Sequence, residues 1–61
     1  MSALTTKELD AIEDQLTSEK NMISKYLHYA EETQDTQLKG MLQGIAKRHQ
    51  AHYDKLFTLL G

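Results

Sequence analysis

The chain has 61 residues with no cysteine, proline or tryptophan, and its 7 Lys and Arg against 9 Asp and Glu give a formal net charge of −2. This charge leaves no basic excess for nucleic acid or anionic lipid, and no apolar run exceeds two residues, so neither nucleic acid nor membrane is expected as a partner and a cytoplasmic chain is predicted. The absence of cysteine excludes disulfides and thiol chemistry, and a chain of this length is expected to be too short for an enzyme with its own cleft.

A long first helix is predicted from about residue 6 to residue 33. No proline interrupts this segment, and most of its residues favour helix. Its start is marked by Thr5 and, three residues later, Glu8, the spacing of a capping box in which both side chains accept hydrogen bonds from free backbone N–H groups. The polar stretch 31–36 then interrupts the apolar pattern.

A turn is predicted at about 34–36, followed by a second helix from about 36 to 60. Asp35 or Thr33 is suited to cap the second helix, and Gly61 is suited to end it. Leu38 restarts the apolar periodicity. The predicted fold class is therefore all-α, a single domain over 1–61 that consists of one antiparallel two-helix hairpin.

Apolar residues recur in both segments at alternating steps of three and four, the spacing of a heptad seam. The seam positions of the first helix are Leu9, Ile12, Leu16, Glu19, Ile23, Tyr26 and Ala30. Those of the second helix are Leu38, Leu42, Ile45, His49, His52, Leu56 and Leu59. When the chain folds back at the turn, each position of one seam faces a position of the other, with residue numbers that sum to 68. The two seams thus predict an antiparallel register.

Further apolar residues widen the stripe beyond what one neighbouring helix can cover. They are Met22, Leu27, Met41, Tyr53, Phe57 and Leu60. Because chains below about 70–80 residues rarely build a sufficient core alone, a homodimer is predicted in which two hairpins form a four-helix bundle. Gly40 and Gly44 would allow another backbone to approach closely, or they merely loosen the helix.

Three seam positions are polar: Glu19 in the first helix, and His49 and His52 in the second. The register places Glu19 opposite His49, with His52 one turn further on the same face. All three lie near the middle of their helices, so a two-fold axis would bring both copies to one level, with two glutamates and four histidines.

Three interpretations of this polar layer follow from its chemistry. Carboxylate and neutral imidazole at His-x-x-His spacing suit zinc, iron or copper, which makes Glu19, His49 and His52 candidate metal ligands, with zinc or iron as the candidate cofactor. Alternatively, the layer is a metal-free hydrogen-bonded network that fixes register and oligomeric state. In the third interpretation the register is shifted by one residue and the histidines lie at an exposed edge.

The same residues resemble a known pattern. They are Glu19, Tyr26 and Ala30 in the first helix, and Ala46, His49 and His52 in the second. This arrangement is similar to one half of the ferritin-like superfamily, in which the first helix supplies a Glu and the second a Glu-x-x-His. A narrower resemblance is carried by Leu16-Thr17-Ser18-Glu19-Lys20, Tyr26, the polar turn, Leu38, Leu42, Ile45 and His49. These residues are most similar to the Coat F type spore coat proteins of endospore-forming bacteria, over roughly residues 5 to 60.

The resemblance implies a ferritin-like bundle with a structural role in sporulation, spore coat localisation, other spore coat proteins as partners and no enzyme activity. One departure bears on this expectation, because His49 stands where the superfamily has the carboxylate that bridges two irons. Oxidase chemistry is therefore not expected. The predicted function is a structural or assembly component of the coat, and the alternative is a metal-binding or metal-storage bundle that uses Glu19, His49 and His52.

Overall fold

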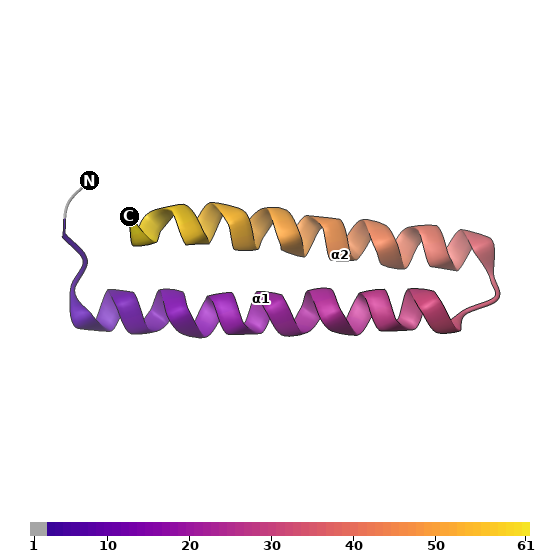
Figure 1. Ribbon diagram of the computed structural model, residues 1–61, viewed down its shortest axis with the longest axis horizontal. Coiled ribbons are helices and arrows are strands. Elements are labelled where there is room, and N and C mark those ends of the chain that lie inside the picture. The colour runs from indigo at the N-terminus through magenta and orange to yellow at the C-terminus, as the bar shows by residue number, and fades with distance from the viewer. Residues whose placement is uncertain (1–2) are drawn as a thin grey trace.

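The computed structural model describes residues 3–61, which form helix α1 at Thr6–Glu32, helix α2 at Thr36–Phe57 and a short 3₁₀ helix, η1, at Thr58–Leu60. The two long helices lie side by side and antiparallel, with the turn at one end and the start of α1 and the end of η1 at the other (Figure 1). No strand occurs in this described range, and the predicted all-α hairpin is confirmed. None of its helices is long and apolar enough to cross a membrane. Residues 1 and 2 of the predicted domain lie outside the described residues.

Helix α1 begins with the predicted capping box. The backbone N–H of Glu8 donates to the Thr5 hydroxyl at 3.1 Å, and the backbone N–H of Thr5 donates to Glu8 Oε1 at 2.9 Å. These hydrogen bonds, first that from the Thr5 backbone, lower the pKa of Glu8 from its usual value. The contribution of Glu8 to stability is therefore present above its unfolded-state pKa and is lost as pH falls through the lowered native pKa.

Helix α1 ends at Glu32, one residue before the predicted limit, because Thr33 adopts an extended conformation with φ −79° and ψ 141°. Both predicted capping residues act in the turn. Asp35 Oδ1 accepts from the backbone N–H of Leu38 at 3.0 Å and caps α2, while the Thr33 hydroxyl accepts from the backbone N–H of Asp35 at 3.2 Å. A tight connection of this kind keeps the two helices adjacent and antiparallel.

Over the segment predicted as the second helix, about 36–60, α2 extends to Phe57 and the last turn tightens into η1 at Thr58–Leu60. The last carbonyl groups of a helix often find partners three residues away instead of four, which converts the final turn to 3₁₀ geometry. The Thr58 hydroxyl also donates to the Lys55 carbonyl at 2.6 Å. Gly61 follows with φ 139°, a conformation open to glycine, and its N–H donates to the Thr58 carbonyl at 3.4 Å.

The buried interior of the hairpin is thin. Among the described residues only Leu16, Glu19, Ala30 and Ala46 are buried, and no large side chain is fully enclosed. The molecule measures 47 × 16 × 10 Å, and its radius of gyration of 14.4 Å exceeds the value of about 10.5 Å that a compact domain of this length would have. The hairpin is therefore an elongated two-helix element with most of its apolar stripe uncovered.

Much of the apolar surface of the hairpin remains exposed, including three seam positions, Leu9, Leu38 and Leu59, that were predicted to face the other helix. Among the described residues, the other exposed large apolar side chains are Leu4, Leu27, Tyr29, Met41, Phe57 and Leu60. Gly40 and Gly44 do not serve the contact between α1 and α2, since a Cβ added at either position would meet nothing within 4 Å. A close approach at these glycines would have to come from outside the hairpin.

Candidate functional site

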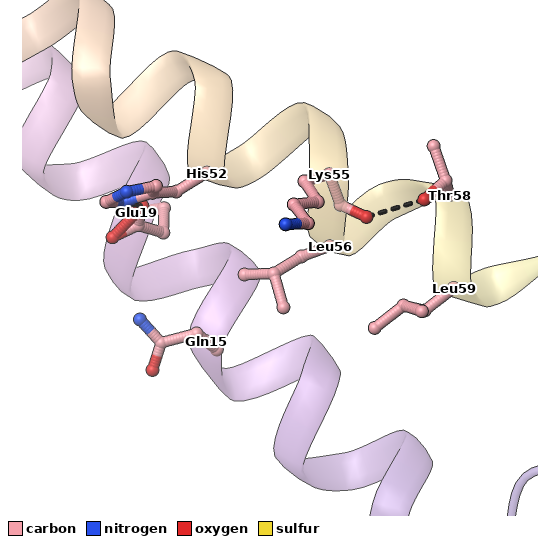
Figure 2. Close-up of a pocket in the computed structure, with 7 residues that line it drawn as sticks. All are labelled: Gln15, Glu19, His52, Lys55, Leu56, Thr58 and Leu59. Carbon is pink, nitrogen blue, oxygen red and sulfur yellow. Dashed lines mark hydrogen bonds and ion pairs between the residues drawn. The ribbon is translucent and has the colours of Figure 1, made fainter.

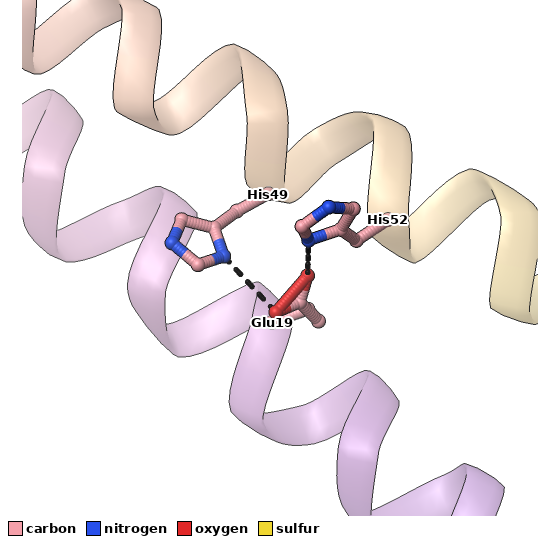
Figure 3. A group of neighbouring side chains, drawn as sticks. All are labelled: Glu19, His49 and His52. Carbon is pink, nitrogen blue, oxygen red and sulfur yellow. Dashed lines mark hydrogen bonds and ion pairs between the residues drawn. The ribbon is translucent and has the colours of Figure 1, made fainter.

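The polar layer lies in the middle of the hairpin, where α1 presents Glu19 to two imidazoles on α2 (Figure 3). Glu19 is 5% exposed and is the only charged side chain among residues 3–61 that is buried. Its place follows from the heptad spacing, which puts residue 19 on the same face of α1 as Leu16. A carboxylate at this depth needs partners, because burial of an unpaired charge is strongly unfavourable.

His49 provides the first partner. Its Nδ1 lies 3.0 Å from Glu19 Oε1 in hydrogen-bond geometry, and the predicted register, which paired these two positions, is confirmed. The imidazole is largely buried, with 21% of its side-chain surface exposed. With a proton on Nδ1, His49 donates to the carboxylate and holds it in place.

His52 lies one turn further along the same helix, and its Nδ1 is 3.2 Å from Glu19 Oε2. The structure therefore brings all three predicted residues together, but it does not bury them equally. The seam pattern predicted His52 inside the layer, whereas 63% of its side-chain surface is exposed. In a single hairpin only α1 covers this face of α2, so a side chain at the edge of the seam remains in contact with solvent.

Glu19 Oε2 is the unsatisfied atom of the cluster. It is buried and has no hydrogen-bond partner, because its contact with His52 lacks the alignment of a hydrogen bond. A buried oxygen without a partner loses its hydration and gains nothing in return, which typically destabilises a protein by about 1–3 kcal/mol. Glu19 Oε2 could therefore accept a hydrogen bond or bind a cation.

Two rings pack near the His49 imidazole. The Tyr26 ring lies parallel to the His49 ring, with an interplanar angle of 4° and centroids 6.2 Å apart, and the His52 ring meets the His49 ring edge to face at 5.8 Å. Tyr29 in turn packs edge to face on Tyr26 at 6.0 Å. Tyr26 thus packs beside His49 at the seam.

An open groove of about 430 Å³ adjoins the cluster on the side of His52 (Figure 2). Glu19 and His52 contribute to one end of the groove, and the side chains of Gln15, Leu56 and Leu59 line it further along the hairpin. The groove gives solvent or a small ligand access to Glu19 and His52.

Two further residues lie outside the cluster. His28 is at the surface, with 65% of its side chain exposed, and it pairs with Glu32 at 3.2 Å. Ala46 was not recognised as a seam residue, yet it is only 3% exposed. The available signal was its position three residues before His49, on the same face of α2, where a small side chain lets α1 approach closely.

The comparisons with known proteins give one match. Residues 7–60 match the Coat F domain, a span that includes both long helices and the whole Glu19, His49 and His52 cluster. No curated protein and no solved structure matches the chain.

Proposed function

We propose that this chain, which belongs to the Coat F domain family, is a non-enzymatic structural component of the bacterial spore coat that assembles through its exposed apolar stripe. The family match supports the coat role. The assembly role rests on one observation: few residues of the hairpin are buried, whereas many of its large apolar residues are exposed. Such a surface is typical of a chain that buries its apolar residues against another chain.

The area of the surface agrees with this role. The accessible surface of the chain is 4864 Å², whereas a compact monomer of 7.0 kDa would expose about 4,000 Å². The excess of roughly 800 Å² is close to the area that each partner buries in a stable interface of standard size. One additional hairpin is therefore enough to cover the surplus.

A second copy of the same chain is the simplest partner. Both helices carry the same heptad spacing, so two hairpins can pack with each other as α1 packs with α2, around a two-fold axis. The proposed product is a four-helix bundle of ferritin-like arrangement, in which the two polar layers lie at one level. Contacts with other coat proteins would use the outer faces of this dimer.

The proposed dimer makes the apparent mass depend on concentration. In sedimentation velocity at micromolar concentration, we expect about twice the chain mass of 7.0 kDa. Substitution of Met41, which is 60% exposed, by Glu is expected to shift the chain to the monomer and to lower its helicity, because a charge would be buried in the interface.

The matched control is Gln43→Glu, which adds the same charge to an exposed polar position two residues further along α2. This variant should sediment like the parent. A parent that is monomeric and fully helical at every concentration would contradict the dimer.

The coat role is tested in spores. Purified spores of a strain that carries the gene for this chain should contain the protein in their coat extract, and the Met41→Glu variant should be depleted from it, because an unassembled component is not retained. Immunodetection in coat extracts and in growing cells measures both. Detection of the parent protein in growing cells, together with its absence from the coat extract, would contradict the proposed role.

A further inference from the structure

We propose that Glu19, His49 and His52 bind one Zn²⁺ ion within each hairpin, in a site with three protein ligands and one position open to solvent. The inference goes beyond the structural role in the coat and does not depend on it. It stands on three observations: the distances within the cluster, the unsatisfied oxygen of Glu19, and the solvent access at His52 (Figure 3).

The distances suit one small cation. One candidate ligand atom from each of the three residues can be chosen so that all lie within 4.8 Å of one another. Zinc binds imidazole nitrogen and carboxylate oxygen at about 2.0–2.2 Å, so two ligands of a tetrahedral ion lie about 3.4 Å apart. The contacts of Glu19 with His49 and with His52, at 3.0 and 3.2 Å, are already near this spacing. Small rotations of the exposed His52 side chain can close the rest.

The unsatisfied oxygen, Glu19 Oε2, favours a bound cation over a metal-free hydrogen-bond network, because the network leaves this oxygen without a partner. Both imidazoles turn the same nitrogen, Nδ1, toward the Glu19 carboxylate, yet only His49 forms a hydrogen bond with it. Glu19 Oε2 is left buried and without a partner. A divalent ion beside this oxygen would compensate the buried negative charge and would bind both imidazoles through nitrogen lone pairs.

The ligand set selects the class of metal. Two imidazoles and one carboxylate are unsuited to Ca²⁺ and Mg²⁺, which prefer ligand sets made of oxygen. Two His and one Glu are instead a known three-ligand set for zinc, with water in the fourth position. Here the groove beside Glu19 and His52 supplies the space for that water and the path by which the ion enters (Figure 2).

Each hairpin contains the complete set of ligands, one from α1 and two from α2. Zinc binding is therefore independent of the dimer. Failure of the metal site and failure of the proposed assembly can be told apart, because zinc stoichiometry per chain and sedimentation mass are measured separately on the parent.

The test is a titration of the full chain, produced without an affinity tag and treated with a chelator. With Zn²⁺ we expect a calorimetric stoichiometry of one ion per chain. With Co²⁺ we expect the intense visible absorption bands of a tetrahedral site, which added Zn²⁺ should bleach. The cobalt spectrum of the parent needs no variant, so it remains informative even if a substitution unfolds the chain.

The variants separate the site from unspecific binding. His52→Ala should weaken zinc binding at least tenfold, and Glu19→Gln should weaken it less, because an amide oxygen still coordinates weakly. His28→Ala is the matched control, since it removes an exposed histidine of α1 that lies outside the cluster. The inference is overturned if the parent shows no cobalt bands, binds far less than one zinc per chain, or loses as much affinity through His28→Ala as through His52→Ala.

Discussion

Replacement of His49 alone by Leu is expected to destabilise the metal-free chain by about 3 kcal/mol, whereas simultaneous replacement of Glu19, His49 and His52 by Leu is expected to leave stability unchanged or to raise it by about 1–4 kcal/mol. The single change removes the hydrogen bond at 3.0 Å and leaves the Glu19 carboxylate buried with no hydrogen bond at all. The triple change removes the buried charge together with its partners and fills the layer with apolar side chains.

The loss in the single variant is large for a chain of this size. Cores of such small chains seldom contribute more than about 3–5 kcal/mol, so the His49→Leu variant should retain at most about 2 kcal/mol and be partly unfolded at room temperature. Denaturant unfolding followed by far-UV circular dichroism, at one fixed chain concentration, measures the parent and both variants. His52→Leu is the control, because 63% of the His52 side chain is exposed and its loss should matter less. A triple variant that is less stable than His49→Leu would show that the polar layer stabilises the fold by itself.

Added zinc is expected to raise the free energy of unfolding of the parent by about 2.7 kcal/mol when free Zn²⁺ is 100 times its dissociation constant. The gain arises because only the folded hairpin brings Glu19, His49 and His52 within 4.8 Å of one another, so the ion binds the folded state in preference to the unfolded one. The measurement is a pair of denaturant titrations after chelation, one with zinc and one without.

The triple Leu variant should gain nothing from zinc, and His28→Ala should gain as much as the parent. Equal zinc-dependent gains in the parent and the triple variant would mean that the ion binds elsewhere. If zinc leaves the parent unchanged, the layer acts as a hydrogen-bonded element that fixes the register, and the same titrations with iron and copper would then test the remaining metals of the predicted set.

Local features of the hairpin could be predicted well from the sequence. The capping box of Thr5 and Glu8 and the cap formed by Asp35 depend on residues three apart in the chain, so the sequence contains all the information that determines them. The sequence did not distinguish the end of α2 at Phe57 from the 3₁₀ turn of η1 that follows it. A change from α to 3₁₀ geometry leaves no clear trace in apolar periodicity, since both spacings place similar residues on one face.

The register of the two helices, and with it the contact between Glu19 and His49, also followed from the sequence. Two heptad seams that meet across a short turn have few ways to align, and a shift of one residue would have placed apolar side chains outside. The resemblance to the Coat F family rested on the same seam residues, and the match to residues 7–60 agrees with it.

Only the tertiary structure decided how deeply each side chain lies. Residues 19 and 52 occupy equivalent seam positions in the sequence, yet Glu19 is 5% exposed and the His52 side chain 63% exposed. Periodicity gives the direction of a side chain around its own helix, but burial depends on which neighbouring helix covers that direction. For the same reason the sequence could not reveal that Glu19 Oε2 has no hydrogen bond, because this depends on the closeness and angle at which α1 and α2 meet.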